Sequence, residues 1–128
     1  MSLKIFIADD SMIIVEKLIN ILSEIKGFKI SGKTYDASKA AGIIRKLNPD
    51  VVILDIRLYH GSGIDVLKQI KKERPSLIVI MLTNYPEADY RKVCLEEGAD
   101  YFLDKSTEFE KVIDICKSLL LQKNYIEK

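Results

Sequence analysis

The sequence has little of what would stabilise a small secreted protein or build a membrane protein. It contains two cysteines and no tryptophan. Cys94 and Cys116 fall on predicted helices without the spacing of metal ligands, so we interpret them as reduced, buried side chains of a cytoplasmic protein. No apolar run approaches the ~20 residues that span a bilayer. The first residues lead directly into a predicted strand, so we expect neither a membrane span nor a signal peptide.

An excess of charge of one sign is also missing. The chain has 20 basic and 19 acidic side chains, which give a formal net charge of +1. This balance provides no electrostatic attraction for nucleic acid or an anionic membrane, so we expect neither as a direct partner. With 128 residues, the chain suits one domain with its own core. We place this domain at residues 1–121 and interpret residues 122–128 as a polar tail that frays.

What the sequence does contain is an alternation of short apolar strands and amphipathic helices. The strands are predicted at residues 3–8, 28–34, 51–55, 77–83 and 101–103. The helices that follow them are predicted at residues 11–26, 37–47, 63–74, 86–97 and 107–121. Because crossovers between parallel strands are right-handed, this order predicts a doubly wound α/β fold, a five-stranded parallel sheet with helices on both faces.

Apolar content and capping signals refine this arrangement. The strand at residues 77–83 is the most apolar and is placed at or beside the centre of the sheet, whereas the more polar strand at 28–34 lies nearer an edge. Capping residues stand at the predicted helix ends: Asp10 or Ser11, Asp36, Pro86, Gly98 and the Thr107-x-x-Glu110 capping box. We therefore expect the last helix to begin at Thr107, and residues 57–62 to form a loop.

Polar side chains lie at the carboxyl ends of four predicted strands. They are Asp9 and Asp10 after the first strand, Asp55 at the third, Thr83 at the fourth and Lys105 after the fifth. Because the carboxyl ends of parallel strands meet at one edge of a sheet, we expect these side chains to converge. Three carboxylates brought together raise one another's pKa unless a cation compensates. Oxygen ligands that leave room for water favour Mg²⁺ over Ca²⁺.

A bound Mg²⁺ would let Asp55 act as a nucleophile toward a phosphoryl group and form an aspartyl phosphate. The ion and the ammonium group of Lys105 would neutralise the phosphoryl oxygens, which is most of what phosphoryl transfer requires of a protein. The hydroxyl of Thr83 can donate a hydrogen bond to one of these oxygens. Taken singly, each residue also fits a structural role, such as a helix cap or a surface lysine. Their joint occurrence at strand ends carries the prediction.

The receiver domain of bacterial two-component response regulators resembles this chain in four segments: Ile7-Ala8-Asp9-Asp10-Ser11, Val52-Ile53-Leu54-Asp55, Met81-Leu82-Thr83 and Asp104-Lys105-Ser106. The resemblance extends from Leu3 to about Leu121 and implies a flavodoxin-like fold. It implies that Asp55 accepts a phosphoryl group from a histidine kinase or a phosphotransfer protein in a Mg²⁺-dependent reaction. It also implies a signalling domain, not an enzyme, which catalyses only its own phosphorylation and dephosphorylation.

The resemblance further implies roles for the residues around this phosphoacceptor. Asp9 and Asp10 would bind Mg²⁺ together with the phosphoacceptor carboxylate and the backbone carbonyl of Arg57. Thr83 and Lys105 would contact the phosphoryl group. The acidic cluster and the lysine would thus form one phosphorylation site.

Thr83 and Phe102 would form a switch, in which the aromatic side chain turns inward when the threonine hydroxyl moves toward the phosphoryl group. Because Phe102 has no hydroxyl, switching there would rest on packing alone. The coupling implies an output surface on the helix at 86–97, the strand at 101–103 and the helix at 107–121. This surface would bind a downstream protein or an effector domain, and it would be the place for a homodimer.

Several positions depart from the pattern usual in the family. Tyr59 and Ser106 stand where proline is common, and Asn84 stands where a small residue is usual and could narrow access to Asp55. His60, the only histidine, is interpreted as a solvated loop residue. Tyr59 and Asn84 leave a second function open, a receiver-fold adaptor that binds partners without phosphorylation.

An enzyme with a nucleophilic aspartate, such as a haloacid-dehalogenase-like phosphatase, is a further alternative. That family has a second aspartate two residues after the nucleophile, where this chain has Arg57. The chain also has no insertion large enough to form a substrate cap, so the phosphatase has less support than the receiver. The sequence fits both a stand-alone receiver and a receiver cut from a longer regulator.

Overall fold

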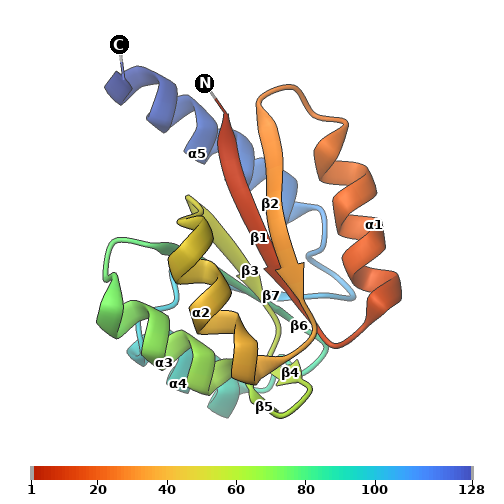
Figure 1. Ribbon diagram of the computed structural model, residues 1–128. Coiled ribbons are helices and arrows are strands. Elements are labelled where there is room, and N and C mark those ends of the chain that lie inside the picture. The colour runs from red at the N-terminus through yellow and green to blue at the C-terminus, as the bar shows by residue number, and fades with distance from the viewer. Residues whose placement is uncertain (1, 128) are drawn as a thin grey trace.

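A parallel sheet with the strand order β2-β1-β3-β6-β7 forms the centre of the computed structural model, which describes residues 2–127 (Figure 1). The order explains the burial of each strand, since β3 at the centre is buried along its whole length. The strand bounds are Leu3–Ala8 for β1, Phe28–Thr34 for β2, Val51–Leu54 for β3, Ile78–Thr83 for β6 and Tyr101–Asp104 for β7. The sequence predictions of an edge position for β2 and a near-central position for β6 are confirmed.

Helices cover both faces of this sheet, as the doubly wound prediction requires (Figure 1). One face carries α1 and α5, and the other carries α2, α3 and α4. The helix bounds are Met12–Ser23 for α1, Ala37–Leu47 for α2, Gly63–Glu73 for α3, Ala88–Glu96 for α4 and Lys111–Glu127 for α5. No helix within residues 2–127 is long and apolar enough to cross a bilayer.

Two hydrophobic cores lie on opposite sides of the sheet because successive strand side chains point to opposite faces. In β1, Phe6 packs into the core under α2 and α3, whereas Ile5 and Ile7 pack into the core under α1 and α5. Cys94 and Cys116 are fully buried free thiols, one in each core, as the sequence analysis predicted. Burial raises the pKa of the Cys94 thiol to about 11 and that of the Cys116 thiol to about 12, so both are unreactive thiols at neutral pH.

The segment predicted as a loop at residues 57–62 contains a small antiparallel hairpin. Its strands are β4, Arg57–Leu58, and β5, Gly61–Ser62. His60 lies between the two strands and Gly61 begins β5. Their positive φ angles, 58° for His60 and 152° for Gly61, allow the chain to reverse tightly. The hairpin also pairs with the segment before α2, since the Tyr59 N–H donates to the Tyr35 carbonyl at 2.9 Å. The prediction of an irregular loop is therefore corrected.

Two helix starts and two helix ends differ from their sequence predictions, and the end of α5 is described below. Helix α1 ends at Ser23, before Lys26. Helix α4 begins at Ala88, so Pro86 lies outside it. Helix α5 begins at Lys111, after the predicted capping box.

The capping box at Thr107 fails because Asp104 and Glu108 organise the preceding segment. The Asp104 carboxylate accepts the Ser106 N–H at 2.9 Å, and the Glu108 carboxylate accepts the Asp104 N–H at 3.0 Å. These contacts close turns that keep residues 106–110 out of the helix. By contrast, Asp36 caps α2 and Gly98 follows α4 with a φ of 102°, as predicted.

Helix α5 also ends later than the predicted residue 121, because it continues to Glu127, and the fraying of residues 122–128 stays a prediction. The Lys123 ammonium group donates to the Ser2 carbonyl and to the Asp50 carboxylate, each at 2.8 Å. These contacts attach the end of α5 to the amino end of the sheet. Lys128 and Met1, at the ends of the predicted tail and domain, lie outside the described residues. The domain boundary at residue 121 stays a prediction.

Candidate functional site

The strand ends bring together four of the predicted site residues in the interior of the protein. Asp9 follows β1, Asp55 follows β3, Thr83 ends β6 and Lys105 follows β7. Their exposed fractions are 2% for Asp9, 4% for Asp55, 0% for Thr83 and 7% for Lys105. Charged side chains are almost never buried this deeply unless they are paired, so the arrangement must compensate its own charges.

Lys105 supplies that compensation. Its ammonium group donates to an oxygen of Asp9 at 2.7 Å and to an oxygen of Asp55 at 3.0 Å. Backbone hydrogen bonds hold these side chains in place, since the Asp55 N–H donates to the Ala8 carbonyl and the Lys105 N–H to the Thr83 carbonyl. The sheet register therefore places one cation between two carboxylates.

The other oxygens of the two carboxylates accept backbone N–H groups. One Asp9 oxygen accepts the Ser11 N–H at 2.8 Å, and one Asp55 oxygen accepts the Ile56 N–H at 2.7 Å. These bonds fix one oxygen of each carboxylate, while the other oxygen of each accepts the Lys105 ammonium group. Main-chain N–H groups thus help to fix the orientation of both carboxylates.

The electrostatics of the cluster follow from burial and mutual charge. Burial, with a smaller contribution from the charge of Asp55, raises the pKa of Asp9 to about 6, although the Lys105 and Ser11 hydrogen bonds oppose this increase. Burial alone would lower the pKa of Lys105, but the hydrogen bonds and charges of Asp9 and Asp55 outweigh it and raise this pKa. The lysine therefore stays charged, while the cluster retains an excess of negative charge.

Asp10 completes a group of three carboxylates that suits a divalent cation. One oxygen each from Asp9, Asp10 and Asp55 lie within 4.8 Å of one another, and Asp10 is half-buried and open to water. Mg²⁺ binds oxygen ligands at ~2.1 Å and keeps several waters, so opposite ligands are ~4.2 Å apart. The oxygen-only donors suit such an ion, and the binding of Mg²⁺ by these three residues stays a prediction.

Gly63 holds the segment after Asp55 against the site. A Cβ atom at this position would lie 1.8 Å from the Asp55 carbonyl oxygen, so only glycine fits. The Gly63 N–H donates to the Ile56 carbonyl at 2.7 Å, which closes the connection between β3 and α3. The sequence analysis did not predict the backbone contact that requires a glycine here.

Arg57 begins the hairpin that follows Asp55 and Ile56 in the chain. The Arg57 side chain is exposed, and its guanidinium lies 4.9 Å from the centre of the Tyr85 ring. The participation of its backbone carbonyl in a metal site stays a prediction. His60 is 74% exposed but contacts Asp36, with Nδ1 2.9 Å from a carboxylate oxygen. Its interpretation as a solvated residue therefore omits a contact that ties the hairpin to the start of α2.

The two predicted switch residues are both buried. The Thr83 hydroxyl oxygen accepts the Tyr85 N–H at 3.0 Å. Phe102 is 4% exposed and faces inward, with the Arg91 guanidinium of α4 lying 4.9 Å from its ring centre. Asn84, which directly follows Thr83, is exposed. Switching by Thr83 and Phe102 stays a prediction. The contact between Arg91 and Phe102 could not be predicted from the periodicity of the sequence.

The comparisons with known proteins agree with this geometry. Residues 5–117 match the family described as the response regulator receiver domain. The chain belongs to this family. Receiver domains are signalling domains of two-component systems that bind Mg²⁺ at an acidic pocket and interact with kinases or phosphotransfer proteins and with effector domains. The sequence interpretation as a receiver is therefore confirmed.

Individual proteins resemble this chain in sequence or in fold. The probable transcriptional regulatory protein TcrX of Mycobacterium tuberculosis is 31% identical over 116 residues, which cover 91% of this chain and 49% of TcrX. The CheY-like receiver domain protein of Methanospirillum hungatei has a TM-score of 0.86 at 23% identity, covering 98% of both chains. A chain of the CheX–CheY–BeF3–Mg²⁺ complex of Borrelia burgdorferi has a TM-score of 0.77 at 28% identity, covering 88% of both.

The curated relatives are longer than this chain. The chain spans about half the length of TcrX, at 49%, and 58% of the transcription regulator BvgA of Bordetella pertussis, to which it is 28% identical. The likeness is therefore to the receiver portion of such regulators. The remaining portions of these regulators have no counterpart in the matched region, so their functions are not assigned to this chain.

Proposed function

We propose that the receiver domain accepts a phosphoryl group on Asp55 from a histidine kinase or a phosphotransfer protein in a Mg²⁺-dependent reaction. The observation that carries this proposal is the buried Asp55 carboxylate, one oxygen of which lies 3.0 Å from the Lys105 ammonium, in a cluster with Asp9 and Asp10 whose carboxylate oxygens lie within 4.8 Å. A carboxylate held between a fixed cation and a cation site is oriented for attack, and the acyl phosphate that it forms is stabilised by the same two cations.

Each residue of the site has a separate task in this proposal. Asp9, Asp10 and the Asp55 carboxylate, with the Arg57 carbonyl, would hold Mg²⁺, which supplies positive charge to the phosphoryl oxygens. Lys105 would move its ammonium group from the carboxylates to a phosphoryl oxygen. The Thr83 hydroxyl would turn from its contact with the Tyr85 N–H and donate to the same group.

The output surface would be formed by α4, β7 and α5. Movement of Thr83 would alter the segment before α4, and the Arg91 side chain connects α4 to the buried Phe102. Exposed apolar side chains on this surface, at 40% for Tyr90, 45% for Leu95 and 39% for Tyr101, suit a protein partner. A downstream protein, an effector domain or a second copy of the receiver would bind there.

The proposal is tested by intact mass measurement after incubation with acetyl phosphate, with and without Mg²⁺. The wild type should gain the mass of one phosphoryl group only with Mg²⁺, and Asp55→Asn should gain none. Asp65→Asn is the matched control, because Asp65 is an exposed aspartate of α3 and its loss removes the same charge. This control should behave as the wild type.

Thermal unfolding with Mg²⁺ gives a second readout that does not require a phosphodonor. A ligand that binds only the folded state raises its stability, so Mg²⁺ should raise the melting temperature of the wild type and of Asp65→Asn but not of Asp55→Asn. An adduct on Asp55→Asn, or Mg²⁺ stabilisation that does not depend on Asp55, would contradict the proposed site. Mg²⁺ binding without any adduct from a phosphodonor or a kinase would favour the phosphorylation-independent adaptor.

A further inference from the structure

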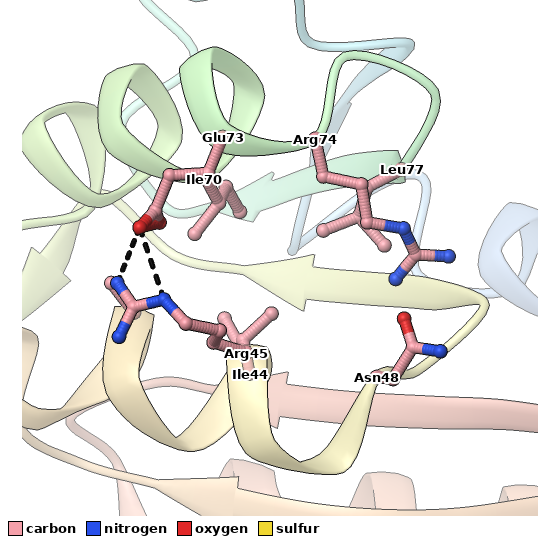
Figure 2. Close-up of a pocket in the computed structure, with 8 residues that line it drawn as sticks. Ile44, Arg45, Asn48, Ile70, Glu73, Arg74 and Leu77 are labelled. Atoms are coloured by element: carbon pink, nitrogen blue, oxygen red, sulfur yellow. Dashed lines mark hydrogen bonds and ion pairs between the residues drawn. The ribbon is translucent and has the colours of Figure 1, made fainter.

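A cavity lies between the carboxyl ends of α2 and α3, at the opposite end of the sheet from the aspartate cluster. It has a volume of about 310 Å³ and is lined by Ala41, Ile44, Arg45, Asn48, Ile70, Glu73, Arg74 and Leu77 (Figure 2). This is the α2–α3 pocket. Its volume falls at the lower end of the range for small-molecule sites, which are typically lined by apolar groups with a few polar ones.

The floor of the α2–α3 pocket is apolar. Ile44 of α2 and Ile70 of α3 face each other across it, as Figure 2 shows, and they are 4% and 2% exposed. Ala41 and Leu77 complete the floor and belong to the same hydrophobic core. A ligand in this pocket therefore needs an apolar body, because a polar one would lose its hydration without gaining hydrogen bonds.

One end of the rim is electrically neutral. Arg45 and Glu73 form an ion pair across the two helices, in which the arginine Nε donates to the carboxylate at 3.1 Å (Figure 2). The two charges cancel, and the pair closes the pocket on this side. This end of the rim offers no excess charge to a ligand.

The other end of the rim carries a positive charge that is only partly engaged. One terminal nitrogen of Arg74 donates to the Pro49 carbonyl at 2.8 Å, and within residues 2–127 its other N–H groups have no protein acceptor. The exposed Asn48 carboxamide points toward this guanidinium across the mouth of the pocket (Figure 2). An arginine fork beside an amide can hold a carboxylate through several N–H donors.

We propose that the α2–α3 pocket binds an apolar monocarboxylate, such as an aryl-substituted or short-chain fatty acid. The carboxylate would lie between Arg74 and Asn48, and the apolar body would extend over Ile44 and Ile70 toward the Arg45–Glu73 pair. The rim has two arginines and one glutamate, so its net charge of about one matches a single anionic group.

Other ligand classes fit this charge pattern less well. A phosphate or a nucleotide would leave most of its charge unmatched by one available guanidinium, and it would place polar groups on the apolar floor. An amine would be repelled by Arg74. The binding is independent of Asp55 and its phosphorylation, since the two sites lie at opposite ends of the strands.

Phenylbutyrate is a suitable probe, and phenylbutanol and phenylbutylamine are its matched neutral and cationic analogues. Each is titrated into the full chain and followed by two-dimensional amide NMR. Phenylbutyrate should shift the resonances of Ala41, Ile44 and Leu77 in a saturable manner. Phenylbutanol and phenylbutylamine should bind at least about tenfold more weakly, the ratio for loss of one charge-assisted hydrogen bond.

Arg74→Met removes the guanidinium but keeps an apolar side chain, and it should weaken phenylbutyrate by about tenfold or more. Lys68→Met is the matched control, because Lys68 is an exposed residue of α3 outside the pocket and its loss removes the same charge. It should bind as the wild type.

Asn48→Asp provides a second variant, since Asn48 has a left-handed backbone with φ of 50°, which aspartate tolerates. It should weaken phenylbutyrate and strengthen phenylbutylamine. Absence of saturable shifts, shifts at other residues, or equal binding by Arg74→Met and Lys68→Met would overturn the proposal.

Discussion

The two ends of the sheet differ in whether their charged side chains are buried or exposed to water. At the carboxyl ends of the strands, Asp9, Asp55 and Lys105 are buried and hold one another in place. At the amino ends, the α2–α3 pocket has an apolar floor and keeps its charged groups at the rim. A buried charge depends on its partner, whereas a charge at the rim is stabilised by water. Substitutions should therefore be severe at the first end and mild at the second.

The largest effect is expected from Gly63→Ala, because the added methyl group would meet the Asp55 carbonyl at 1.8 Å. Backbone atoms cannot move aside cheaply, so we expect a loss of about 4 kcal/mol in the free energy of unfolding. Urea unfolding measures it. Gly42→Ala is the control, because the Cβ would meet nothing within 4 Å and α2 should become about 0.5–1 kcal/mol more stable. Equal stability of the two variants would show that the connection after Asp55 is not tightly packed.

A smaller but still large effect is expected from Lys105→Met, which leaves two buried carboxylates without their cation. Removal of one member of a buried ion pair costs about 3 kcal/mol. Urea unfolding at pH 8, in EDTA, should show this loss, and Lys68→Met, an exposed control, should show almost none.

The cost of Lys105→Met should decrease at lower pH, and the sign follows from Asp9. Because the pKa of Asp9 is raised from 3.8 to about 6, the folded state binds its proton more tightly than the unfolded state does. The contribution of this group to stability is complete below pH 3.8 and is lost as the pH rises through about 6. A neutral Asp9 needs no lysine, so the difference between the variant and the wild type should be smaller at pH 5 than at pH 8. A constant difference would contradict this electrostatic origin.

The smallest effect is expected at the rim, from Glu73→Gln. The side chains of Arg45 and Glu73 are 59% and 38% exposed, so water already screens the pair. We expect a change of less than about 1 kcal/mol in urea unfolding. A loss comparable to that of Lys105→Met would remove the contrast between the two ends of the sheet.

Much of the aspartate site could be predicted from the sequence, because its logic is local to each strand. An apolar run that ends in Asp55 or Thr83 shows where a strand ends, and parallel strands place such ends at one edge. The contacts of Lys105 could not be predicted in the same way. Its hydrogen bond to Asp9 joins residues 96 positions apart, and it depends on the register of all the strands between them.

The ends of elements were predicted less well, since contacts from outside the element decide them. Thr107 and Glu110 match the residue types of a capping box. However, the Asp104 carboxylate accepts the Ser106 N–H and the Glu108 carboxylate accepts the Asp104 N–H, and α5 begins only at Lys111. At the other end of α5, the Lys123 ammonium group donates to the Asp50 carboxylate. The polar segment after residue 121, which was predicted to be a tail, therefore continues as helix to Glu127. Neither effect has a signal in the local periodicity.

The sequence by itself determined the alternation of strands and helices, the sheet edge and the polar residues placed there, because apolar periodicity and strand-end chemistry are properties of neighbouring residues. Only the tertiary structure decided how deeply Asp9, Asp55 and Lys105 are buried and that α2 and α3 enclose a cavity. Burial and cavities arise from the packing of segments far apart in the chain, and free energies of buried charges depend on that packing.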